Sequence, residues 1–191
     1  RVIVHEKVMA NFLDALKPRV EAIKVGDPKS ADTKVGTLIS EAEAIRVEKS
    51  IATAVSEGAT LLTGGARTGA IVMPAIVCGV NPKSAFAQDE LFGPAIAVSS
   101  TTGITDAISI ANDSPYGLGA GVFTKNMDNS IQAARELDAG SIHINWTPLW
   151  RADLMPYGGL KSSGIGKEGV RSTVNEMTEE KTIILHGRNW L

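Results

Sequence analysis

The sequence has little of what extracellular, membrane or nucleic-acid-binding proteins rely on. One cysteine, Cys78, occurs in 191 residues, so no disulfide can form within the chain and we expect a reducing compartment, the cytoplasm. The longest apolar run, residues 70–80, is too short to cross a bilayer and is interrupted by Pro74. The net charge is only -2 and no basic stripe is present. We therefore expect neither nucleic acid nor a membrane as a partner.

Metal-ligand spacing is also missing. The three histidines, His5, His143 and His186, are scattered, and neither a His-x-x-x-His pair nor a pair of cysteines occurs. We therefore expect no metal site. We interpret His143 as a hydrogen-bonded core histidine, with a position facing a cleft as the alternative.

What is present indicates a folded α/β protein. Hydrophobic residues make up 43% of the chain, which is enough for a sizeable core. Apolar spacing predicts a helix over residues 6–22, and short apolar runs such as 71–77 and 95–99 between helical stretches predict strands. This alternation is typical of an α/β fold with a largely parallel sheet flanked by helices.

Local signals place the ends of several elements. Ser40 has the character of an N-cap, with Glu43 at the capping-box position, and Asp128 is predicted to cap a helix that runs to Leu137. Residues 181–186 read as a lone terminal strand. Such a strand needs an edge to pair with, and a neighbouring subunit can supply one.

Glu90 and Phe92 lie on an irregular loop next to a Gly-Pro turn. Loops carry function more often than strands do. A carboxylate can hold ribose hydroxyls, and an aromatic ring can pack on a flat heterocycle. The alternative, which spacing alone favours, is a solvated glutamate and a core phenylalanine.

A second candidate is the loop between residues 145 and 156, which is rich in aromatic side chains. Arg151 lies there with Trp146 and Trp150, and Tyr157 follows. A guanidinium holds a carboxylate, phosphate or sulfonate through two N–H bonds, so these residues form a plausible wall for a small anionic ligand. A surface pair between Arg151 and Asp153, with incidental tryptophans, explains the same residues.

Two further motifs favour structural interpretations. The glycine-rich segment 158–166 does not have the spacing of a dinucleotide fingerprint or a Walker loop, so we interpret it as a tight turn rather than a phosphate cradle. Cys78 lies in an apolar run without a neighbouring basic residue. A buried thiol of this kind is expected to be inert rather than nucleophilic.

Six motifs follow one another in an informative order. They are Val25-Gly26-Asp27-Pro28, Glu90-x-Phe92-Gly93-Pro94, Asn112 with Tyr116-Gly117-Leu118, the segment 140–145, Pro156-Tyr157-Gly158-Gly159-x-Lys161-x-Ser163-Gly164, and Glu176-Met177-Thr178-Glu179-x-Lys181-Thr182. Together they resemble the C-terminal half of the NAD(P)-dependent aldehyde dehydrogenases, over essentially all of the chain.

The resemblance implies a specific organisation. Residues 1–175 would form part of the aldehyde dehydrogenase catalytic domain, and residues 176–191 a C-terminal oligomerisation arm that makes the protein a homo-oligomer. Glu90 would hold the nicotinamide ribose of NAD or NADP, and Phe92 would flank the nicotinamide. Tyr157 would line the aldehyde pocket with Trp146 and Arg151.

The resemblance also implies that part of the machinery lies elsewhere. The family's nucleophilic cysteine would precede Arg1 by a few residues, and the general base, the oxyanion donor and the cofactor domain would lie further upstream. We therefore expect no catalytic residue in this chain and no activity from it alone. The parent would oxidise a small aldehyde, and the 151–156 loop resembles that of relatives acting on anionic ones. The alternative is a non-catalytic relative that regulates partner subunits through its terminal strand.

Overall fold

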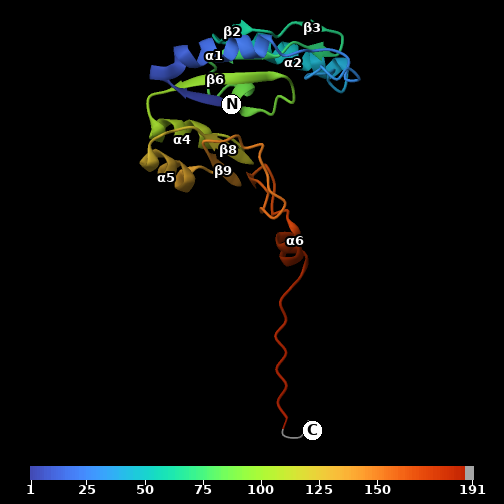
Figure 1. Ribbon diagram of the computed structural model, residues 1–191, viewed down its shortest axis with the longest axis vertical. Coiled ribbons are helices and arrows are strands. Elements are labelled where there is room, and N and C mark those ends of the chain that lie inside the picture. The colour runs from blue at the N-terminus through green and yellow to red at the C-terminus, as the bar shows by residue number, and fades with distance from the viewer. Residues whose placement is uncertain (188–191) are drawn as a thin grey trace. The chain divides into compact units, whose positions relative to one another are not determined.

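The structure is a computed structural model and describes residues 1–187, which divide between Ser114 and Pro115 into two compact units (Figure 1). The elements of the first unit are β1 (Val2–His5), η1 (Glu6–Val8), α1 (Met9–Glu21), α2 (Glu41–Ser56), β2 (Thr60–Thr63), β3 (Arg67–Thr68), β4 (Ile71–Val72), β5 (Ala75–Cys78), α3 (Ala85–Gln88), β6 (Ala95–Thr101) and α4 (Ile104–Asn112). The second unit contains β7 (Tyr116–Gly117), β8 (Gly119–Val122), α5 (Met127–Glu136), β9 (Ser141–Ile144), β10 (Leu160–Lys161) and α6 (Val170–Met177).

The central sheet of the first unit has the strand order β1-β6-β5-β2. β6 pairs in parallel with both β1 and β5, whereas β2 is antiparallel to β5. This confirms the expected α/β class with a largely parallel sheet. The apolar run 71–77 is divided into β4 and β5, because Pro74 cannot donate a ladder hydrogen bond.

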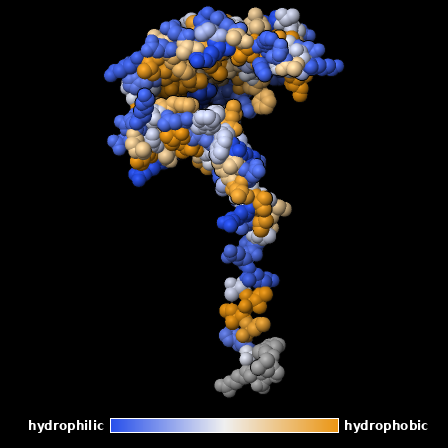
Figure 2. All heavy atoms as spheres, viewed as in Figure 1, coloured by the Kyte–Doolittle hydropathy of each residue, from blue (hydrophilic) through white to orange (hydrophobic). Residues whose placement is uncertain are grey.

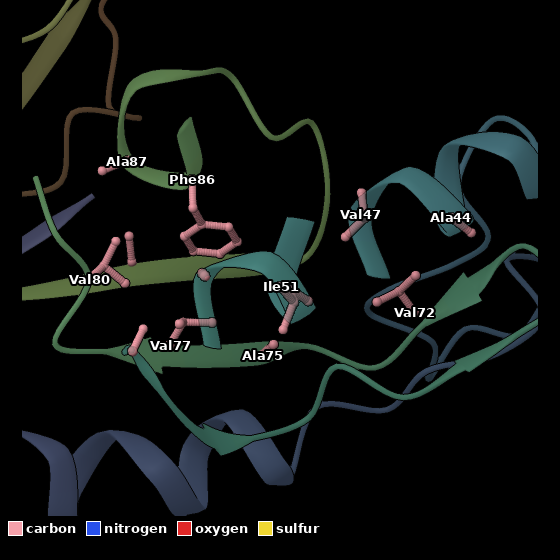
Figure 3. Close-up of a cluster of buried hydrophobic side chains, with 12 residues drawn as sticks. Ala44, Val47, Ile51, Val72, Ala75, Val77, Val80, Phe86 and Ala87 are labelled. Carbon is pink, nitrogen blue, oxygen red and sulfur yellow. The ribbon is translucent and has the colours of Figure 1, made fainter. Parts of the chain in front are cut away.

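Both faces of this sheet are buried, as a parallel sheet requires. Along β5, Val77 belongs to the cluster packed against α2, and the neighbouring Ile76 belongs to the cluster packed against α1. Side chains alternate between the two faces of a strand, which explains why the continuous apolar run supplies both clusters. Figure 3 shows the α2 side, where Val47 and Ile51 come from the helix and Phe86 from α3.

Helix ends follow the local signals in part. The Ser40 hydroxyl accepts a hydrogen bond from the Glu43 amide at 3.2 Å, which confirms the predicted N-cap of α2. The predicted cap at Asp128 is wrong. Asn126 caps α5 instead, through its Oδ1 and the Asn129 amide at 3.1 Å. Both residue types favour N-cap positions, but the helix begins at Met127, so Asp128 lies within its first turn.

The second unit holds a parallel β8–β9 pair and an antiparallel β7–β10 pair. Asn145 ends β9 in the left-handed conformation, with φ of 56°. Its Oδ1 accepts a hydrogen bond from the Thr124 amide at 2.8 Å, and its own amide donates to the Val122 carbonyl at 2.7 Å. Asn145 therefore ties the ends of β8 and β9 together.

The terminal segment differs from its predicted form. Residues 178–187 have neither helix nor strand, although 181–186 read as a strand from sequence. A strand requires ladder hydrogen bonds, and the described part of this single chain supplies none to this segment. Ile183, Ile184 and Leu185 remain 68–76% exposed (Figure 2). The oligomerisation arm over 176–191 stays a prediction, and its residues 188–191 lie outside the described ones.

Candidate functional site

The first candidate site is the loop from Glu90 to Pro94, which joins α3 to β6. Glu90 is exposed, and the Phe92 ring is 80% exposed rather than part of the core. Phe92 has φ of +49°, a conformation that side-chain-bearing residues adopt rarely and at a cost. The loop thus presents a carboxylate and a largely bare aromatic ring on a strained backbone.

Glu90 borders an open hollow of about 250 Å³ between α2 and the segment from α3 to the loop. The residues lining it are Arg46, Lys49, Ser50, Thr53, Ala85, Phe86, Asp89, Glu90 and Leu91. Two cationic side chains and two carboxylates therefore share one recess, beside hydroxyl groups. A recess of this kind can bind a ligand that carries hydroxyl groups, through charge-assisted hydrogen bonds.

Arg46 was not among the residues singled out from sequence. Its Nη2 donates to the Leu91 carbonyl at 2.5 Å, and its Nε donates to Glu43 Oε2 at 2.8 Å. The only local signal is the i, i+3 spacing of Glu43 and Arg46 on α2. The contact to Leu91 joins residues 45 positions apart, so it follows from the tertiary fold alone.

The second candidate site brings Arg151 and Tyr157 together. The guanidinium carbon of Arg151 lies 4.5 Å from the centroid of the Tyr157 ring, within cation–π range. Arg151 Nη1 also lies 3.1 Å from Glu168 Oε2. Backbone hydrogen bonds between Tyr157 and Glu168 hold the two strands of this site side by side.

The structure corrects the partner of Arg151. The alternative expectation was a surface pair with Asp153, and Arg151 pairs with Glu168 instead. Sequence reasoning missed Glu168, because it lies 17 residues away and only the turn through the glycine-rich segment brings it back. The Arg151 side chain remains 40% exposed, so an incoming anion can reach it.

The tryptophans of this loop have different roles. Trp150 packs edge-on against His143, with ring centroids 6.3 Å apart and an interplanar angle of 77°. Trp146 is 58% exposed. We interpreted His143 as a hydrogen-bonded core histidine, but its Nε2 is buried without a hydrogen-bond partner among the described residues.

The glycine-rich segment has close backbone packing. A Cβ on Gly159 would lie 2.4 Å from Ser163 Cβ, and a Cβ on Gly140 would lie 1.6 Å from the Gly158 carbonyl oxygen. Only glycine fits such approaches. The Gly158 carbonyl accepts a hydrogen bond from Lys167 Nζ at 3.1 Å. These contacts support the structural interpretation of the segment as a tight turn.

Cys78 and the histidines add no further chemistry. Burial raises the pKa of the Cys78 thiol above its ordinary value, which keeps it protonated and unreactive near neutral pH. Within residues 1–187, His, Cys, Asp and Glu side chains nowhere gather in threes as a metal ion would need. In the same range, every helix is too short or too polar to cross a membrane.

The ordered motifs and the fold agree with a family match. The sequence matches the model of the aldehyde dehydrogenase family over residues 1–183. The chain belongs to the aldehyde dehydrogenase family. It is 42% identical over 186 residues to a 3-sulfolactaldehyde dehydrogenase of Priestia aryabhattai, an alignment that covers 97% of this chain and 39% of that protein. A lactaldehyde dehydrogenase of Methanococcus maripaludis is 39% identical, with 97% and 40% covered.

Solved structures of family members superpose closely on the chain. Aldehyde dehydrogenase 21 of Physcomitrella patens, in complex with the product succinate, has a TM-score of 0.93 and 33% identity, with 99% of this chain and 39% of that one covered. The NADP complex of a glyceraldehyde-3-phosphate dehydrogenase of Methanocaldococcus jannaschii has a TM-score of 0.90 and 37% identity, with 96% and 40% covered. The chain thus spans about two fifths of the length of these relatives.

Proposed function

We propose that this chain is the C-terminal, catalytic-domain portion of an NAD(P)-dependent aldehyde dehydrogenase that acts on a small anionic aldehyde. The overall reaction converts the aldehyde, water and NAD(P)+ to the carboxylic acid, NAD(P)H and a proton. It requires a cysteine thiolate as the nucleophile. The partly buried Cys78, whose thiol pKa is raised, is unsuited to that task, so the isolated chain should be inactive.

The first candidate site supports the cofactor assignment. The Glu90 carboxylate borders a hollow large enough for a sugar ring, and the exposed Phe92 ring offers a flat apolar surface. A carboxylate accepts hydrogen bonds from ribose hydroxyls, and an aromatic ring packs against a nicotinamide. When bound at this site, the cofactor would supply the hydride acceptor. Family structures solved with NADP and with NAD+ support this proposal.

The observation that carries the substrate class is the position of Arg151. The Tyr157 ring and Glu168 orient its guanidinium, and its side chain stays 40% exposed. A fixed and accessible guanidinium recognises carboxylate, phosphate or sulfonate groups. Three relatives support this proposal: the names of two refer to sulfolactaldehyde and to glyceraldehyde 3-phosphate, and the third was solved in complex with its product succinate.

A matched pair of substrates tests the anion role in the full-length enzyme. Sulfolactaldehyde and lactaldehyde share a carbon skeleton and differ by a sulfonate. Because a hydrogen bond to a charged group is worth roughly 1.5–3 kcal/mol, we expect Arg151→Ala to raise KM for sulfolactaldehyde by about tenfold or more. KM for lactaldehyde should change little. Arg171→Ala, an exposed arginine on α6, is the control. Equal losses on both substrates would remove the anion role.

The terminal segment supports a second element of the proposal, a homo-oligomer. Residues 183–185 form an apolar stretch that the described chain leaves exposed. An extended apolar segment gains hydrogen bonds and burial when it joins the sheet edge of a neighbouring subunit. Ile184→Asp should therefore shift the full-length protein to smaller species in light scattering after gel filtration. Unchanged mass would exclude this segment from the interface.

A further inference from the structure

The backbone of Phe92 is held in a conformation that phenylalanine rarely adopts without support from surrounding residues. Its φ of +49° places a bulky aromatic residue in the left-handed region, which such residues adopt rarely and at an energetic cost. Its ring is 80% exposed, so the ring's own burial does not compensate. The surrounding contacts must therefore hold the backbone in this shape.

Three contacts surround Phe92 along the chain. On one side, Arg46 Nη2 donates to the Leu91 carbonyl at 2.5 Å. On the other side, Gly93 lies against α2 so closely that a Cβ would be 2.6 Å from Val47 Cγ2. The next carbonyl, that of Pro94, accepts from the Ala75 amide at 2.8 Å. Two of the three contacts are made by α2, so this helix acts as the support of the loop.

Arg46 is itself fixed in direction. Its Nε donates to Glu43 Oε2 at 2.8 Å, one turn earlier on the same helix. The guanidinium is a rigid fork, so anchoring Nε sets the direction of both Nη groups. One of these groups then reaches Leu91, the residue between Glu90 and Phe92. Glu43 and Arg46 thus form a strut from α2 to the loop.

Arg46 also lines the hollow beside Glu90, but its Nε and Nη2 already donate to Glu43 and to the Leu91 carbonyl. We therefore propose that Arg46 is a positioning residue for the cofactor, which acts through the Leu91 carbonyl to hold Glu90 and Phe92 ready for binding. The inference rests on the cofactor site proposed above. Without the strut, Phe92 can relax from its strained conformation, and binding must then order the loop again. A cost of that kind weakens cofactor binding but leaves the bound geometry, and hence the chemical step, nearly unchanged.

Steady-state kinetics of the full-length enzyme test this role. We expect Arg46→Ala to raise KM for the cofactor about tenfold, which corresponds to about 1.4 kcal/mol, with kcat changed by less than about twofold. Arg46→Lys keeps one cationic donor and should recover part of the loss, with KM raised about threefold. Its recovery separates a lost contact from a misfolded protein.

Arg67→Ala is the matched control. Arg67 also binds α2, through Glu48 at 2.8 Å and Glu41 at 3.2 Å, but none of these contacts reaches the loop. We expect Arg67→Ala to lower the melting temperature while leaving the cofactor KM near its original value. Equal KM increases in Arg46→Ala and Arg67→Ala would mean that Arg46 only stabilises the helix, and would overturn the proposal.

A double-mutant cycle separates positioning from direct contact. If Arg46 acts through the loop, Arg46→Ala should add little to the KM increase already caused by Phe92→Ala. Full additivity would mean that Arg46 touches the cofactor independently, which would also overturn the inference. If Phe92→Ala and Glu90→Gln both leave the cofactor KM unchanged, the proposed cofactor site is itself wrong and the strut has nothing to position.

Discussion

The substitution Gly93→Ala tests whether the loop from Glu90 to Pro94 packs against α2 as closely as the structure shows. A Cβ at this position would lie 2.6 Å from Val47 Cγ2 and 3.0 Å from Cγ1, and Val47 is fully buried. Carbon atoms pack at about 3.5 Å or more, so Gly93→Ala must push the loop and the helix apart by about 0.9 Å. Overpacking of this size costs typically about 1–3 kcal/mol. The melting temperature should therefore fall, by less than the about 2–4 °C per kcal/mol that a 150–250-residue protein would show, because the full-length protein is longer.

The assay combines calorimetry with cofactor binding on the full-length protein. Gly36→Ala is the control, because its Cβ would meet Pro28 at an ordinary 3.5 Å. Since the displaced segment includes Phe92, Gly93→Ala should also weaken cofactor binding. Val47→Ala in the same protein removes the clashing methyl groups, so the double variant should be more stable than the two single effects predict. Equal melting temperatures for Gly93→Ala and Gly36→Ala would refute the packing argument.

Three further outcomes follow from local contacts. Ser40→Ala removes the acceptor for the Glu43 amide and should cost about 1 kcal/mol, seen as a lower melting temperature. Cys78, whose pKa is raised by burial, should be alkylated by iodoacetamide more slowly at pH 8 than a peptide cysteine, as followed by mass spectrometry. Hydrogen bonds from the Thr102 amide and a threonine hydroxyl lower the pKa of Asp106. This stabilisation is complete above about pH 4 and is lost as the pH falls through the lowered pKa. The difference in melting temperature caused by Asp106→Asn should therefore shrink in acid, and a constant difference would contradict the assignment.

Much of the fold could be read from short stretches of sequence. The cap at Ser40 depends on contacts within one helical turn, and the alternation of helices and strands depends on hydrophobic periodicity. Where two neighbouring residues suit the same position, the sequence does not determine which of them occupies it. Asn126 and Asp128 both suit an N-cap, and Asn126 occupies it in the structure because α5 begins at Met127. Residues 181–186 form no strand, because nothing within the described residues supplies them with ladder hydrogen bonds.

Some residues of the candidate sites could be predicted from the sequence and others could not. Glu90, Phe92, Arg151 and Tyr157 were identified by motif and residue type, and the structure brings the last two within 4.5 Å. Glu168, the counter-ion of Arg151, had no local signal. Arg151 and Glu168 approach each other only because the chain reverses direction between them, and no short sequence pattern predicts such a contact.

The sequence by itself determined the family, the α/β class and the residue types at both sites, because these depend on local motifs and on the hydrophobic pattern. Only the tertiary structure decided how the loop from Glu90 to Pro94 is held. The contact from Arg46 to Leu91 joins residues 45 positions apart. The close packing of Gly93 against Val47 requires α2 to lie directly beneath the loop. Contacts between residues far apart in the sequence form only when the packed core brings their elements together. The contacts that hold this loop on α2 could therefore be identified only from the tertiary structure.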